Sequence, residues 1–201
     1  MKYFAFLLLI ASFVLASCAT ATPKPPKPEP QPDHVVLWQN GAWVQMPQAE
    51  FDKIQAEKAK KAQDIKDKAA IVETPSLEAL FAAPTGFLGK QAKISSAMKA
   101  EFKKFAGGKY RTMIPMGDKM LILIAYDADY TFTTKNIAME KEKYGLDFMT
   151  MNKAQVEANP TINISNLQGL VLSEGNSSTV DFKTKETMEY KSVTIQLVSL
   201  N

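Results

Sequence analysis

Six prolines between residues 23 and 32 divide this chain into parts that fold under different rules. Proline fixes φ and lacks a backbone donor, so this segment cannot enter a helix interior or a central strand. We expect residues 19–33 to form an extended polyproline II tether, which at ~3.1 Å per residue reaches roughly 45 Å. A second possibility is that the prolines dock in an aromatic groove. A folded core has to come from the residues that follow.

The residues before the prolines carry a second strong pattern. Lys2 precedes an apolar run over residues 4–15, and the small residues Ala16 and Ser17 lead to Cys18, the only cysteine. The run is too short for a bilayer of ~30 Å, which needs about 20 residues, and it is typical of a secretory signal. The stretch from Leu15 to Cys18 resembles the lipobox of bacterial lipoproteins. That resemblance implies diacylation of the Cys18 sulfur and cleavage before it.

These residues predict an address outside the cytoplasm. Residues 1–17 are the expected signal peptide, and several acyl chains on Cys18 would anchor the mature protein stably in a membrane. Ala19 follows the cysteine where enterobacterial relatives retained in the inner membrane have aspartate, so the resemblance favours the outer membrane. The alternative is an ordinary signal peptide with an unused cysteine. With no second cysteine, an internal disulfide is excluded.

Residues 34–75 are expected to hold a β-hairpin and a long helix. Asn40-Gly41 lies between two apolar stretches and favours a two-residue type I′ turn, because both residues take positive φ there. That register places Trp38 opposite Trp43. The indoles either cover the chain's own helix or domain or form an exposed platform for glycan, peptidoglycan, peptide or another partner. Over residues 48–72 the charges alternate and apolar residues are sparse, which predicts a solvated spacer helix.

Residues 76–201 are numerous enough for one α+β domain with its own core. We expect short helices near residues 77–81 and 153–158, and a third helix over 90–105 with an apolar face and opposing lysines. Short connections between consecutive strands favour a mostly antiparallel sheet with helices on one face. The expected strands cover residues 109–114, 119–126, 130–139, 146–151, 168–173, 179–183 and 187–200.

One motif raises the question of catalysis. An apolar strand leads into Asp127-Ala128-Asp129-Tyr130-Thr131, which resembles the first motif of haloacid-dehalogenase-type phosphatases. The resemblance implies that Asp127 is a nucleophile, that Asp129 is a general acid and that Mg²⁺ is bound. This family usually has the motif at the start of a large parallel α/β domain, whereas the residues that follow here predict hairpins. Asp-Ala-Asp is also good turn chemistry between two strands.

The remaining residues exclude most other chemistry. His34 is the only histidine, so histidine triads and histidine metal sites are out, and no glycine-rich phosphate loop is present. We expect no metal, no cofactor and no nucleic-acid partner. The sequence predicts a non-enzymatic, lipid-anchored envelope protein that presents its C-terminal domain to an envelope protein or to peptidoglycan. A Mg²⁺-dependent phosphatase and a glycan-binding module remain the alternatives.

Overall fold

The computed structural model describes residues 24–180 and 185–201. The chain divides into two compact units. The boundary between them, at Ala56 and Glu57, lies inside helix α2 (Gln48–Ala70). Each unit is described by itself below. Among the described residues, no helix is both long and apolar enough to cross a membrane.

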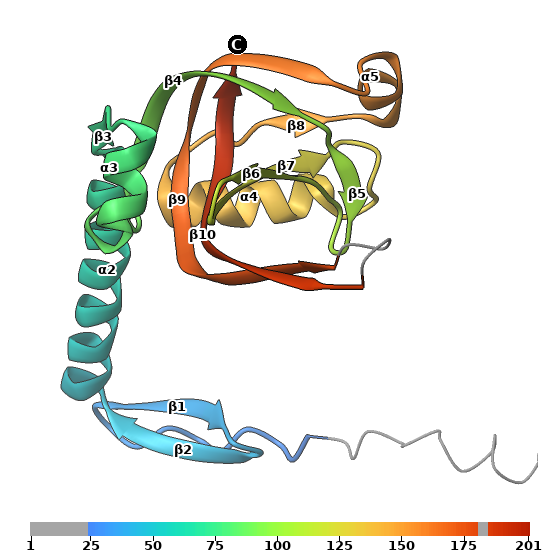
Figure 1. Cartoon of the computed structure of the whole chain (residues 1–201). Coiled ribbons are helices and arrows are strands. Elements are labelled where there is room, and N and C mark those ends of the chain that lie inside the picture. Colours follow the sequence, from blue (N-terminus) through green and yellow to red (C-terminus); the bar gives the residue numbers. More distant parts are fainter. Residues whose placement is uncertain (1–23, 181–184) are drawn as a thin grey trace, which may run out of the picture. The chain divides into compact units, whose positions relative to one another are not determined.

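The first unit is built on a β-hairpin. Strands β1 (His34–Gln39) and β2 (Ala42–Pro47) form an antiparallel pair (Figure 1). In its register, Trp38 lies opposite Trp43. The turn residues Asn40 and Gly41 have φ of 50° and 79°, as the predicted type I′ turn requires. The hairpin prediction is therefore confirmed, turn and register included.

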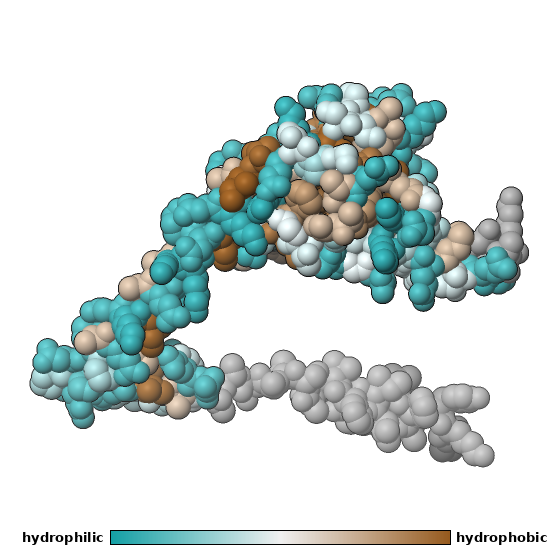
Figure 2. All heavy atoms as spheres, turned by 60° about the vertical axis from the view of Figure 1, so that its left-hand side comes forward, coloured by the Kyte–Doolittle hydropathy of each residue, from teal (hydrophilic) through white to brown (hydrophobic). Residues whose placement is uncertain are grey.

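Helix α2 begins directly after β2 and matches the predicted spacer helix. Only Ala69, in its last turn, is buried. Figure 2 shows hydrophilic residues over most of the helix surface that faces the viewer. The alternating charges place acidic and basic residues four positions apart. In the described structure, one such ion pair joins Glu57 Oε1 to Lys61 Nζ at 2.8 Å. Such exposed pairs contribute only about 0.3–0.5 kcal/mol each, so α2 is held mainly by helix propensity and by its last turn.

The second unit is an α+β domain around a mixed sheet (Figure 1). Its strand order is β3-β4-β9-β10-β7-β6-β5, and β8 pairs with β7. Four pairings are antiparallel, and β10–β7, β3–β4 and β7–β8 are parallel. The strands are β3 (Val72–Glu73), β4 (Gln91–Ala100), β5 (Lys103–Phe105), β6 (Lys109–Met116), β7 (Lys119–Asp127), β8 (Thr150–Met151), β9 (Ile162–Val180) and β10 (Thr187–Leu200).

The sheet curls because a short stretch of chain connects strands from its two sides. Only Glu101 and Phe102 separate β4, which pairs with β9, from β5, which pairs with β6. The Phe102 side chain is buried in the main core. That core also holds Ile94, Leu123 and Ile195 from three different strands. The two residues between β4 and β5 thus bring a strand next to one end of the strand order and the strand at the other end around one apolar interior.

In residues 24–180 and 185–201, four helices accompany these strands. Besides α2 they are α3 (Leu77–Ala82), α4 (Thr133–Tyr144) and α5 (Lys153–Ala158), with a short 3₁₀ turn at Pro84–Gly86. Ser76 caps α3 and Asn152 caps α5, each by accepting a backbone N–H. A second apolar cluster contains Ala69 of α2, Tyr126 of β7, Phe148 and Leu170, with Ile137 of α4 packed against it.

Two predicted elements are wrong in type. Residues 90–105 were expected to be helical, but they form β4 and β5. Their outward lysines Lys93 and Lys99 therefore belong to a strand rather than to the polar face of a helix. Residues 130–139 were expected to be a strand, but they contain the start of α4.

Three smaller expectations also need correction. The strand expected over residues 146–151 is reduced to β8. Gly175 and Asn176, which lie between two of the expected strands, are inside β9, where both residues pair with β10. The strands expected over residues 168–173 and 179–183 are therefore one continuous strand as far as Val180.

Candidate functional site

The predicted lipidation site, Cys18, lies outside the described residues, as do the rest of the leader and Pro23. The structure describes two other places where side chains predicted to be functional meet polar partners. The first is the tryptophan hairpin, and the second is the carboxylate of Asp127 at the end of β7.

The two indoles of the hairpin form one aromatic pair. Trp38 and Trp43 lie opposite each other, with ring centroids 5.0 Å apart and ring planes inclined by 72°. This edge-to-face arrangement is the one that the ring quadrupoles favour. Both side chains are half-buried. The residues that contact the two indoles precede the hairpin in the sequence.

The proline-rich segment lies on this pair. The Lys24 ammonium is 4.5 Å from the Trp38 ring centroid and 4.3 Å from that of Trp43, so a single cation contacts both rings. The Trp43 Nε1–H donates to the carbonyl oxygen of Pro25 at 2.8 Å. The indoles are therefore engaged within the chain, but by the proline-rich segment and not by the helix or domain that the first of the two expectations named.

Gln45 holds the same segment two residues further along β2. Its side-chain Nε2 donates to the carbonyl of Glu29 at 3.4 Å, and its Oε1 accepts from the backbone N–H of Gln31 at 3.2 Å. Because side chains alternate along a strand, Gln45 and Trp43 project from the same face. One primary amide thus binds both a donor and an acceptor of the proline-rich backbone.

Residues 24–32 are consequently not a free spacer. The prediction of an unattached tether is wrong for these nine residues, and the alternative, docking on aromatic side chains, is what the structure has. Sequence reasoning named Trp38 and Trp43 but missed Lys24 and Gln45. One feature of the sequence could have indicated the role of Gln45. It shares a strand face with Trp43, and the run of prolines lies shortly before it in the chain.

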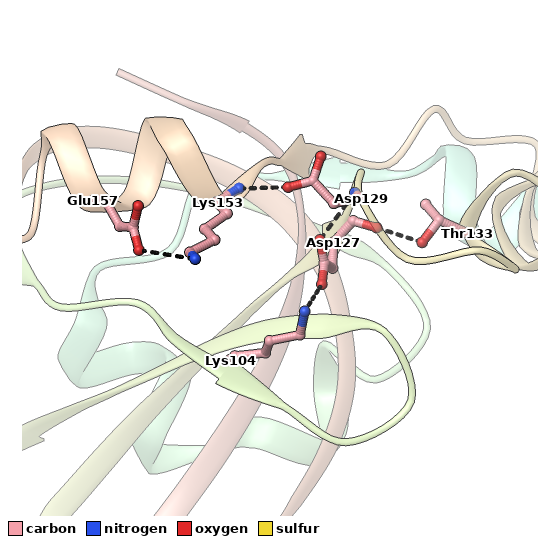
Figure 3. A network of polar contacts seen from close by, with 6 residues as sticks. All are labelled: Lys104, Asp127, Asp129, Thr133, Lys153 and Glu157. Atoms are coloured by element: carbon pink, nitrogen blue, oxygen red, sulfur yellow. Dashed lines mark hydrogen bonds and ion pairs between the residues drawn. The ribbon is translucent and has the colours of Figure 1, made fainter.

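The second place is the end of the central strand β7. The Asp127 side chain is fully buried (0 % exposed), and its Oδ2 lies 2.9 Å from the Lys104 Nζ of β5 (Figure 3). Among the described residues, that ion pair is the only polar contact of Oδ2. Its Oδ1 accepts the backbone N–H of Asp129 at 3.0 Å, and the Thr133 hydroxyl donates to the Asp127 carbonyl.

The buried charge affects its neighbours. The Lys104 ammonium donates to the Asp127 carboxylate, and this hydrogen bond, with the ionic attraction between the two groups, raises the pKa of Lys104 above its ordinary value. Burial, and after it the charge of Asp127, raises the pKa of the Tyr110 phenol. Lys104 thus stays protonated opposite the carboxylate over the whole neutral range.

Asp129 has a different partner. Its Oδ2 accepts the backbone N–H of Lys153 at 2.8 Å, where α5 begins (Figure 3). An acidic oxygen at the start of a helix satisfies a donor that the helix itself leaves free. The two aspartates therefore tie β7, β5, α4 and α5 together at one corner of the domain.

This geometry gives the phosphatase alternative no support. A nucleophilic carboxylate has to reach a phosphorus atom, whereas the Asp127 oxygens are buried and engaged by Lys104 and Asp129. The surrounding sheet is mixed, with β7 in an antiparallel hairpin with β6, unlike the large parallel domain of that family. In the described part of the chain, no three acidic, histidine or cysteine side chains are grouped to hold a metal.

The domain also has a basic groove beside this corner. It has a volume of about 490 Å³ and lies along β4, β5 and β6. The cations that line it are Lys99, Lys103, Lys104 and Arg111, against the single carboxylate of Glu101. Phe105 contributes an apolar wall, and the Arg111 guanidinium lies 3.8 Å from its ring centroid. The groove therefore combines positive charge with an aromatic surface.

No protein-family model, no curated protein and no solved structure matches this chain. Its function therefore has to be inferred from its own residues.

Proposed function

We propose that this protein is a non-enzymatic envelope lipoprotein, anchored by acyl chains on Cys18 in the outer membrane, whose C-terminal α+β domain binds an anionic envelope partner. The observation that carries the anchor is the Leu15–Cys18 stretch with the chain's only cysteine, directly after an apolar run. The division of the chain into two compact units inside an exposed helix supports the presenting role.

The anchor is tested by one substitution with a matched control. Cys18→Ala removes the sulfur that would accept the acyl chains, whereas Ser17→Ala keeps a small residue before it. We expect metabolic labelling with a fatty-acid analogue to mark the wild type and Ser17→Ala but not Cys18→Ala. Detergent, and not salt, should then release the two labelled proteins from membranes. Release of wild-type protein by salt, with the leader intact, would overturn the anchor.

The basic groove supports the choice of partner chemistry. Lys103 and Lys104 already face Glu101 and Asp127, at 3.4 Å and 2.9 Å. Lys99 and Arg111 make no ion pair with the described residues, so they carry the groove's uncompensated charge. A partner that brings carboxylates, such as the peptide stems of peptidoglycan or an acidic protein segment, complements that charge.

Binding to isolated peptidoglycan sacculi tests this proposal directly. Wild-type protein should co-sediment with sacculi, and the double variant Lys99→Glu/Arg111→Glu should lose most of that binding. Lys135→Glu on the exposed face of α4 is the control, because it changes the net charge away from the groove. If the wild type does not bind sacculi, in-cell crosslinking from position 111 should capture an acidic protein instead. Failure of both would remove the partner proposal.

A further inference from the structure

The proline-rich segment runs back along the hairpin, a feature that the anchoring role does not require. Asp33 has a positive φ of 57° and reverses the chain just before β1. As residue numbers fall from Gln31 to Pro25, the contacts move along β2 from Gln45 to Trp43, toward the turn. The segment thus lies against the length of the hairpin, with Lys24 at the aromatic pair.

The hydrogen bonds from the hairpin are made to backbone groups that are typical of a polyproline segment. The carbonyls of Pro25 and Glu29 that accept these hydrogen bonds both precede a proline. A polyproline II helix has no internal hydrogen bonds, so its carbonyls point outward and need external donors. The indole of Trp43 and the amide of Gln45 supply those donors. The N–H of Gln31, one of the few donors that the segment has, is bound as well.

We infer that Trp38, Trp43 and Gln45 form a binding site for proline-rich peptides in the polyproline II conformation, and that residues 24–32 of the same chain are its resident ligand. Recognition uses two carbonyls that precede proline, four residues apart, one backbone N–H and a lysine cation over the two rings. Aromatic grooves bind such peptides well because a polyproline II ligand is already extended and loses little entropy.

Attachment in cis explains why this site is filled. Only Asp33 separates the segment from β1, so the ligand is present at an effective concentration of about the millimolar range or above. A peptide in solution has to exceed that concentration to displace it. The site is therefore closed to weaker proline-rich ligands while the chain's own segment is in place. This inference does not depend on lipid at Cys18.

The chain provides its own reporter for a test. Its only two tryptophans are the two in the site, so indole signals report on nothing else. The full chain, purified in detergent, is compared with a variant in which residues 24–32 are replaced by glycine and serine. A synthetic peptide with the sequence of residues 24–32 is then added to each. A peptide in which every proline is glycine is the control ligand.

We expect the replaced variant to show altered tryptophan emission and a saturable response to the proline peptide, with none to the glycine peptide. The wild type should not respond at the same peptide concentrations. An equal response of both proteins would overturn occupation in cis, and no response of either, with unaltered emission in the variant, would overturn the site. Occupation by a second copy is distinguished by dilution, which would then change the wild-type emission.

A second pair of variants keeps the inference testable if the replaced chain does not form its hairpin. Gln45→Ala removes the amide that binds residues 29 and 31, whereas Gln39→Ala alters an exposed glutamine on the opposite face of the hairpin. In the otherwise intact chain, Gln45→Ala should speed solvent exchange of the Trp43 indole proton about fivefold, as expected for one net hydrogen bond. Gln39→Ala should leave it unchanged. Equal exchange in both variants would overturn the role of Gln45.

Discussion

At the scale of single residues, the least expected contact joins Asp127 to Lys104. The sequence Asp-Ala-Asp predicts either a phosphatase nucleophile or a turn, and the hydrogen bond from the Asp129 N–H to Asp127 is that of a turn. Lys104 could not be predicted, because nothing in the local sequence indicates that its side chain reaches the end of β7. A buried carboxylate without such a cation would be strongly unfavourable.

Removing that cation should therefore destabilise the domain. We expect Lys104→Ala to lower the free energy of unfolding clearly, because it leaves the buried Asp127 charge without its cation. Lys103→Ala, which alters only an exposed pair with Glu101, should stay within about 0.5 kcal/mol of wild type. Adding Asp127→Asn to Lys104→Ala should restore part of the loss. Urea unfolding measures all of these, and equal stabilities of the two single variants would refute the role given to Lys104.

Tyr126 gives a prediction for alkaline pH. Burial raises the pKa of its phenol to about 12, whereas an unfolded tyrosine ionises near pH 10. Between these values the unfolded state binds fewer protons than the folded one, so stability falls as pH rises. Phenylalanine cannot ionise, so Tyr126→Phe should make the fall between pH 10 and 12 shallower by up to about 2 kcal/mol. Urea unfolding at pH 9 and 11.5 compares the two proteins, and parallel losses would contradict the assignment.

At the scale of elements, the error at β4 follows from an ambiguity of period. Ile94, Met98 and Phe102 are spaced by four residues, a spacing that a helix and a strand both bring to one face. Ala92 and Ala100 distinguish a strand from a helix here. Both are buried, and together with Ile94 and Met98 they follow the alternation of a strand, in which every second residue faces the core. As alanine is small and favours helices, its place in the alternation carried little weight.

The error at α4 has a different origin. The threonine and aromatic residues at its start favour a strand by local propensity. The better signals stand at its end, where Lys141 and Lys143 occupy the last turn and Gly145 takes a left-handed φ of 71°. By contrast, the hairpin turn at Asn40-Gly41 and the capped helix α5 could be predicted closely, because their signals lie within a few residues of each other.

Strand β9 contains two glycines that offer a matched test. A Cβ on Gly169 would lie 2.5 Å from the backbone oxygen of Gln196 in β10, whereas a Cβ on Gly175 would meet nothing within 4 Å. We expect Gly169→Ala to cost about 1–3 kcal/mol, because the two strands have to move apart. Gly175→Ala should change stability by less than about 0.5 kcal/mol. Thermal unfolding ranks the two, and a harmless Gly169→Ala would show that the strands do not approach so closely.

At the scale of the whole molecule, the local sequence predicts neighbours along the chain but not distant ones. The hairpin of β6 and β7 follows from the short turn at Gly117-Asp118. The parallel pairing of β10 with β7, and the antiparallel pairing of β4 with β9, involve residues far apart in sequence. The sequence predicts the docking of residues 24–32 only as an alternative, since composition alone does not distinguish a free tether from a bound one.

The division into two units predicts that the chain does not unfold in one step. Both tryptophans report on the first unit, and Tyr110, Tyr126 and Tyr190 on the second. A hairpin with few partners is marginally stable, so tryptophan fluorescence should change at lower urea than the tyrosine signal in near-UV circular dichroism. Gly41→Ala, which places a side chain at a φ of 79°, should shift only the tryptophan transition, by about 1 kcal/mol. Transitions that coincide in the wild type and move together in Gly41→Ala would mean that the chain unfolds as one cooperative body.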